Sequence, residues 1–266
     1  MRRSVSCRIE AEILRPTDVV LSVSLATGTS LEAESLLMTI GGDEVSCHEV
    51  LADHGTRLHI IDDARPGRLV VTYTATAFGA GTPAAVSDVD PVEFRRPSRY
   101  CESDRLTGFA QDQFRGLQGA ELVRSVASWV GQRVAYVPGS SRSIDGAVST
   151  LLAREGVCRD FAHLTAALLR ACDVPARLVS VYAPGLHPMD FHAVTEALID
   201  GRWLVVDATC LAPRTALLRI ATGRDAADTA FLTSTGTTLE LRSLDVHATT
   251  DGDLPVDDVR RDVELA

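Results

Sequence analysis

The stretch VCRDFAHLTAALLRAC, residues 157–172, has apolar side chains on most faces of a helical wheel and stops before Pro175. A helix exposed to solvent carries a polar face, so this pattern predicts a central helix that is largely buried. Cys158 falls in the first turn of that helix. We therefore expect a fold organised around one buried helix with a thiol near its N-terminus.

Short apolar runs typical of β-strands follow the central helix, at residues 177–182, 191–199 and 202–208. Asp200-Gly201 lies between the last two runs, and this dipeptide favours a two-residue hairpin turn. The region after the helix therefore predicts an antiparallel sheet, and the whole domain an α+β fold in which the central helix packs against that sheet.

Two more helices are predicted ahead of the central one. The run 119–134 has apolar residues at helical spacing. A second helix is expected over 144–155, with Ser143 as its cap and Gly156 as the residue that ends it.

The first 80 residues consist of short runs rich in Val, Ile, Leu and Thr, separated by turn residues. Several such runs at short spacing favour a small antiparallel β-sandwich. The expected strands are 4–13, 18–26, 35–40, 57–61 and 68–77.

The composition shifts to Gly, Pro, Ala and Asp after this region, which indicates a domain boundary. We predict a β-rich domain at 1–80, a linker at 81–97, a catalytic core at 98–235 and a C-terminal segment at 236–266. That last segment is expected to hold a strand over 238–246 and an acidic, mobile tail over 251–266.

The chain has 266 residues and a formal net charge of −10, and all its basic side chains are arginine. This balance argues against nucleic-acid binding, which needs a clustered basic face. No run reaches the roughly 18–20 apolar residues of a membrane helix, and no export signal is apparent. We expect a cytoplasmic protein with six reduced cysteines and no membrane partner. The sequence carries no signal for its oligomeric state.

Cys158 occupies an informative position for a thiol. At a helix N-terminus, unpaired backbone N–H groups and the positive end of the helix dipole favour the thiolate, which is the nucleophilic form. Position alone leaves an inert buried thiol as an equal alternative. A catalytic role requires a base nearby.

His192 and Asp207 are the candidate base and its partner. A two-residue turn at 200–201 places His192 opposite Thr209 and Asp207 opposite Val194. Both side chains then lie on one face as diagonal neighbours, ~7–8 Å apart at the backbone, within reach of an imidazole and a carboxylate. The sequence therefore predicts an oriented His–Asp pair on a strand platform.

Less specific interpretations remain for each residue taken singly. His192 alone fits a core histidine, and Asp207 a polar residue at a strand end. His163 lies five residues after Cys158, about 140° around the helix, so we expect a packed or hydrogen-bonding histidine. A zinc site of Cys158, His163, His192 and Cys210 lacks fixed ligand spacing, and we expect neither a metal nor a cofactor.

Four blocks of the chain resemble, in order, the core of the transglutaminase-like superfamily: GVCRDFA (156–162), VPAR (174–177), FHAV (191–194) and WLVVDAT (203–209). Segments at 98–104 and 134–139 are similar to bacterial members. The resemblance covers roughly residues 95–210 and implies a papain-like α+β core. The chain departs from many relatives at Val194, where they carry an aromatic residue.

The resemblance implies a role for each matching residue. Cys158 would be the nucleophile, His192 the general base and acid, and Asp207 the group that fixes the imidazole tautomer. The Cys158 backbone N–H would form part of the oxyanion hole, with Tyr136 as the candidate second donor.

The expected activity is hydrolysis of peptide, isopeptide or side-chain amide bonds in a protein, peptide or amide substrate, through a thioester. Transfer of the acyl group to an amine is the alternative, as in a protein-glutamine transglutaminase. A non-catalytic module that recruits a partner is a third interpretation.

Overall fold

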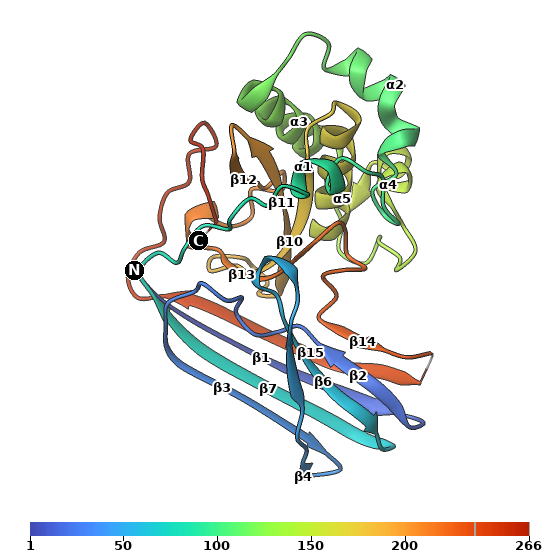
Figure 1. Cartoon of the computed structure of the whole chain (residues 1–266), viewed down its shortest axis with the longest axis vertical. Helices are drawn as coiled ribbons and strands as arrows, with labels where there is room; N and C mark the ends of the chain where they lie inside the picture. The colour runs from blue at the N-terminus through green and yellow to red at the C-terminus, as the bar shows by residue number, and fades with distance from the viewer. Residues whose placement is uncertain (237, 266) are drawn as a thin grey trace.

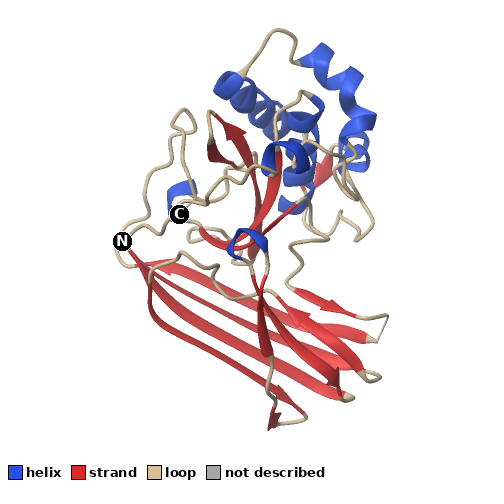
Figure 2. Ribbon diagram, viewed as in Figure 1, coloured by secondary structure: helices blue, strands red, loops and turns tan. Residues whose placement is uncertain are grey.

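The computed structural model describes residues 1–236 and 238–265. Figure 1 shows a β-sandwich below and a mixed α/β unit above it, and Figure 2 shows that nearly all helix lies in the upper part. The sandwich strands are β1 (Arg2–Ile13), β2 (Thr17–Leu21), β3 (Leu31–Ile40), β4 (Asp43–Glu44), β5 (His48–Leu51), β6 (Arg57–Ala64), β7 (Gly67–Phe78), β14 (Leu232–Ser234) and β15 (Leu239–Thr250).

The sandwich is built from two antiparallel sheets, ordered β15-β1-β7-β3-β4 and β14-β2-β6-β5. Buried and exposed residues alternate along β1 and β7, because successive side chains point to opposite faces of a sheet. The inward residues, such as Ile9 and Tyr73, form a closed core. The predicted sandwich is confirmed, and β15 completes it by pairing with β1.

The upper unit contains α1 (Asp90–Glu93), α2 (Ser103–Gln113), α3 (Gly119–Arg133), β8 (Ala135–Tyr136), α4 (Ala147–Ala153), β9 (Glu155–Gly156), α5 (Cys158–Ala171), β10 (Ala176–Tyr182), β11 (Phe191–Ile199), β12 (Arg202–Val206) and β13 (Leu218–Gly223). Its main sheet is antiparallel, in the order β12-β11-β10-β13. Helix α5 packs against β10 and β11, and α3 against β11 and β12. The α+β fold with a central helix against an antiparallel sheet is confirmed.

Helix α5 lies at the centre of the upper unit and supplies much of its hydrophobic core. Leu164, Leu168 and Leu169 are fully buried between the other helices and the sheet. Each such side chain contributes about 1.5–3 kcal/mol when it leaves water. Among the described residues, no helix is long and apolar enough to cross a membrane.

The helix that we expected over 144–155 is shorter. Helix α4 starts at Ala147 after Gly146 and ends before Arg154, which adopts a left-handed conformation with φ of 60°. Asp145 accepts hydrogen bonds from the Arg142 backbone and guanidinium, which hold these residues in a turn instead of a helix. Ser143 is therefore not the cap, and Gly156 belongs to β9.

The C-terminal segment after β15 is docked on the core, contrary to the mobile tail that we expected. Arg214 donates to both carboxylate oxygens of Asp257, at 2.9 and 3.1 Å. The Val205 N–H donates to the Val263 carbonyl at 2.8 Å, and Leu265 is only 2% exposed. This segment therefore covers the free edge of β12. The domain boundaries themselves stay a prediction.

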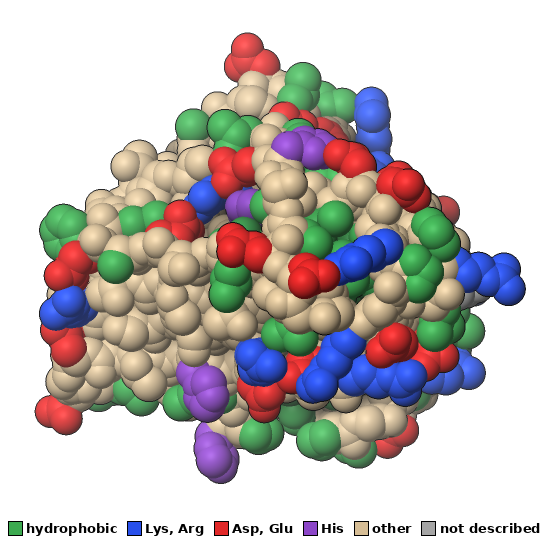
Figure 3. Space-filling model, turned by 90° about the horizontal axis from the view of Figure 1, so that it is seen from below, with side chains coloured by type: hydrophobic (Ala, Val, Ile, Leu, Met, Phe, Trp, Pro, Cys, Tyr) green, Lys and Arg blue, Asp and Glu red, His purple; other side chains and the backbone are tan. Residues whose placement is uncertain are grey.

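Figure 3 views the molecule from the sandwich side and shows arginine side chains next to acidic ones. Among the ion pairs of the sandwich, Arg57 pairs with Glu34 and Glu49, and Arg68 pairs with Glu10. The arginines of these pairs are therefore neutralised locally.

Candidate active site

The β11–β12 hairpin sets the positions of His192 and Asp207. Thr195 pairs with Val206 and Ile199 with Arg202, which is the register predicted from the Asp200-Gly201 turn. Both turn residues have positive φ, 50° and 74°, as a type I′ turn requires. The predicted hairpin is confirmed.

His192 and Asp207 are joined by a hydrogen bond of 2.8 Å between the imidazole Nε2 and the carboxylate Oδ2. The other carboxylate oxygen, Oδ1, accepts from the Thr209 backbone N–H at 2.9 Å and from its hydroxyl at 2.6 Å. His192 is 1% exposed and Asp207 7%. Both oxygens of the Asp207 carboxylate are therefore held by hydrogen bonds, and the carboxylate fixes the orientation of the His192 ring.

Cys158 is the first residue of α5, as predicted, and it is half-buried. Asp160 accepts a hydrogen bond from the Val157 N–H at 2.8 Å, which satisfies a donor at the start of the helix. A Cβ on Gly156 would come within 2.7 Å of the Asp160 Cβ. Only glycine therefore allows β9 to approach α5 this closely, and Asp160 supports the start of the helix.

The electrostatics of His192 follow from its partners. Burial by itself would lower its pKa, but the charge and hydrogen bond of Asp207, together with the Cys158 thiol, raise the pKa to about 10. Burial would likewise raise the pKa of Asp207, but His192 and the Thr209 hydrogen bonds lower it. The buried pair is therefore most stable as imidazolium and carboxylate.

The second ring nitrogen of His192, Nδ1, is buried and makes no hydrogen bond of good geometry within the described part of the chain. The Cys158 thiol is nevertheless close enough to act as a hydrogen-bonding neighbour that raises the pKa of the ring. Nε2 is held by Asp207, so Nδ1 is the ring nitrogen left available to accept a proton from the thiol. Catalytic hydrogen bonds are often loosely aligned before substrate binds.

The other five cysteines lie in surroundings that favour the neutral thiol. Burial raises the pKa of Cys7 to about 11 and that of Cys101 to about 12. Burial also raises the pKa values of Cys47, Cys172 and Cys210. Cys158 differs from them in lying next to the His192 ring. All six cysteines are unpaired.

Tyr136 is brought to Cys158 by a short parallel ladder, in which Tyr136 of β8 pairs with Gly156 of β9. Burial and the adjacent Cys158 raise the pKa of the phenol to about 12, so it keeps its proton. Cys158 is therefore an immediate neighbour of this phenol. Tyr136 is therefore a protonated donor beside the thiol.

His163 lies on α5 but apart from this pair. It is fully buried, its Nε2 accepts from the Ala226 N–H at 3.1 Å, and its ring stacks on Tyr100 at 5.2 Å. Burial lowers its pKa to about 3 despite the nearby charge of Asp225. It is the packed, hydrogen-bonding histidine that the sequence predicted. The zinc alternative finds no support, since the described residues include no cluster of three metal-binding side chains.

Two residues of the site were not singled out from the sequence. Thr209 orients Asp207, and a Thr two residues after a carboxylate at a strand end is the available signal. Asp190 precedes β11 and accepts from the Phe191 N–H at 2.7 Å. Burial raises the pKa of Asp190, while the charge of His192 opposes this. A carboxylate therefore lies near His192.

A family model described as the Transglutaminase-like superfamily matches residues 104–208. A solved structure of a candidate cysteine protease from Cytophaga hutchinsonii is similar over 97% of this chain and 94% of its own, with a TM-score of 0.86 and 32% identity.

An uncharacterised protein of Mycobacterium leprae is 31% identical over 111 residues, which are 41% of this chain and 38% of the relative. One of Mycobacterium bovis is 45% identical over 62 residues, 23% of this chain and 20% of the relative. The chain thus matches less than two-fifths of the length of these mycobacterial relatives.

Proposed function

We propose that this chain, which belongs to the transglutaminase-like superfamily and is a thiol enzyme, uses Cys158, His192 and Asp207 to hydrolyse peptide, isopeptide or side-chain amide bonds. One observation carries the proposal: the 2.8 Å bond that holds His192 Nε2 on Asp207 and leaves Nδ1 free, in a ring that has the Cys158 thiol as a neighbour. This is the arrangement of nucleophile, base and orienting carboxylate that acyl transfer requires.

Acylation starts with the Cys158 thiol proton on His192 and the sulfur attacking the amide carbonyl carbon. A C–S bond forms and the carbonyl oxygen becomes an oxyanion. As the tetrahedral intermediate collapses, the C–N bond breaks and the imidazolium donates its proton to the leaving amine. The products of this half-reaction are a free amine and a thioester on Cys158.

Deacylation reverses these roles. His192 takes a proton from water while the water oxygen attacks the thioester carbon. Collapse breaks the C–S bond, releases a carboxylic acid and returns the proton to the sulfur. Asp207 stabilises the imidazolium in both halves, which its lowered pKa permits because the carboxylate stays ionised.

The oxyanion is assigned to the Cys158 backbone N–H and the Tyr136 hydroxyl. The raised pKa of Tyr136 supports this role, since an oxyanion donor must carry a proton. Tyr136→Phe removes the hydroxyl and keeps the ring on Phe161, whose centroid is 5.9 Å away. We expect kcat to fall about 10²-fold with KM little changed. An unchanged kcat contradicts the assignment.

The test of hydrolysis measures amine release from fluorescein-labelled casein and ammonia release from carbobenzoxy-glutaminyl-glycine. We expect wild type to act on one of these substrates and Cys158→Ala to be inactive with an unchanged melting temperature. Full activity in Cys158→Ala would contradict the proposal.

Transglutamination is the alternative outcome for the same acyl-enzyme, with an amine in place of water. Incorporation of dansylcadaverine into casein, faster than hydrolysis, favours it. A partner-binding module without catalysis is favoured if a captured protein stays bound after alanine replaces Cys158, His192 and Asp207.

Substrates are proposed to be proteins, peptides or amides, and the location to be cytoplasmic.

A further inference from the structure

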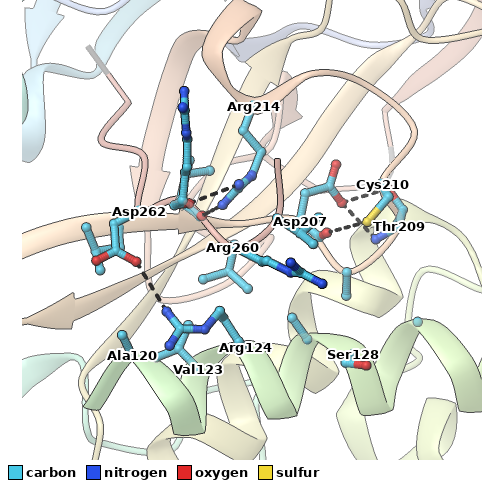
Figure 4. A pocket seen from close by; sticks show the side chains of 18 of the residues that line it. Ala120, Val123, Arg124, Ser128, Asp207, Thr209, Cys210, Arg214, Arg260 and Asp262 are labelled. Carbon is cyan, nitrogen blue, oxygen red and sulfur yellow. Dashed lines mark hydrogen bonds and ion pairs between the residues drawn. The ribbon is translucent and has the colours of Figure 1, made fainter. Parts of the chain in front are cut away.

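A cavity of about 500 Å³ lies at the free edge of β12, between α3 and the C-terminal segment (Figure 4). Cys158 and His192 do not line it. Asp207, Thr209 and Cys210 do, so the cavity adjoins the loop that carries the Asp207 carboxylate. It is a separate site that shares one wall with the active site.

The floor of the cavity is apolar. Val123 and Ala127 come from α3, and Leu204, Val206 and Ala208 come from β12 and the residues after it. Val259 of the C-terminal segment lies on the rim and is 56% exposed. A volume of this size with an apolar floor matches the pockets in which proteins bind small molecules.

The charged side chains around the cavity leave one cation uncompensated. Arg214 pairs with Asp257, Arg124 lies 3.5 Å from Asp262, and Arg261 lies 3.9 Å from Asp258. Arg260 has no ion-pair partner within residues 1–236 and 238–265. Figure 4 shows its side chain extended across the cavity, between α3 and the loop of Asp207 and Thr209.

We propose that this cavity binds a small organic anion, with a single carboxylate or sulfonate on an apolar body. The anionic group contacts the Arg260 guanidinium, which offers a planar set of donors suited to a carboxylate. The apolar body covers the floor and the exposed Val259. A bound anion also rests against the Asp207 loop, so the cavity is placed to act as an effector site.

A peptide strand fits this edge less well. Strand addition needs free backbone donors and acceptors along β12. The Val205 N–H is already bonded to the Val263 carbonyl, and the Val205 carbonyl accepts from Arg214 at 3.3 Å. The edge is therefore closed to backbone pairing here, while the volume beside α3 stays open.

The test uses 8-anilinonaphthalene-1-sulfonate, a fluorescent organic sulfonate, with the full chain. We expect saturable binding that octanoate displaces and that neutral octan-1-ol at equal concentration does not. Arg260→Gln removes the charge, and Ala127→Leu fills the floor. Each should weaken binding by about tenfold or more, Arg260→Gln because the charge-assisted contact is lost and Ala127→Leu because the larger side chain occupies the floor.

Arg133→Gln is the control for the loss of one arginine charge, because Arg133 lies at the end of helix α3 and outside the cavity. It should bind the dye as wild type does, and all variants should keep the wild-type melting temperature. The proposal is overturned if binding does not saturate, if Arg260→Gln behaves like Arg133→Gln, or if octan-1-ol competes as well as octanoate. The test is independent of any activity of Cys158.

Discussion

Two histidines are buried equally deeply in this core, and their pKa values are shifted in opposite directions. His192 is 1% exposed with a pKa of about 10, and His163 is fully buried with a pKa of about 3. Burial alone disfavours the cation at both positions. The difference is the partner: His192 bonds to a carboxylate, while His163 accepts from a backbone N–H. The pKa of each buried imidazole therefore depends on its hydrogen-bond partner.

The comparison predicts that the two histidines differ most in catalysis. His192→Ala should lower the rate of acyl transfer about 10³-fold, because it removes the group that moves the proton. His163→Gln, which can still accept from the Ala226 N–H, should stay within a few-fold of wild type. Steady-state hydrolysis of the casein substrate measures both. Equal losses of rate in the two variants would contradict the different roles of His192 and His163.

Asp207→Asn makes the partner of His192 neutral. The pKa of His192 should fall toward its ordinary value, and the rate should drop about 10²-fold or more, because an amide no longer stabilises the imidazolium. Titration of the His192 ring proton by NMR follows the first effect. A His192 pKa that stays near 10 in this variant would show that another group raises it.

How much of this site the sequence predicts depends on how local its geometry is. The hairpin register follows from two turn residues, and the pairing of Thr195 with Val206 agrees with it. Helix α5 is equally local, since its apolar run is continuous. These two elements carry all three proposed catalytic residues.

The parts that sequence reasoning missed are set by distant contacts. Strand β13 follows residues 207–217, which form loops and a short 3-10 helix at Arg214–Ala216, and it becomes a strand by pairing with β10. The C-terminal segment reads as acidic and mobile, yet Arg214 and the edge of β12 bind it. Helix α2 has few apolar residues and is held by packing on α5. The partners of these three segments are distant in the sequence, so the local sequence pattern of each segment does not predict the pairing.

The smallest predicted effect is on stability, and it has opposite signs for the two histidines. The pKa of His163 is lower in the folded state than the unfolded value of about 6.5, so stability should fall as pH drops below 6.5. The loss from this group between pH 6.5 and 5 is about 2 kcal/mol. Urea unfolding of wild type and His163→Gln at both pH values measures it.

For His192 the folded pKa is raised, so its contribution is complete below about pH 6.5 and is lost as pH rises through about 10. The stability difference between wild type and His192→Ala should therefore shrink from pH 7 to pH 10. A stability difference that grows over this range would contradict the raised pKa of His192.

The central claim is that His192 activates Cys158, and alkylation tests it without a substrate. Iodoacetamide is added at several pH values, and the modified cysteines are mapped by mass spectrometry in wild type and in His192→Ala. We predict that Cys158 reacts well before the other five thiols at pH 7 and that His192→Ala removes this advantage. If Cys158 reacts no faster than the others, or only after unfolding, the catalytic account is contradicted.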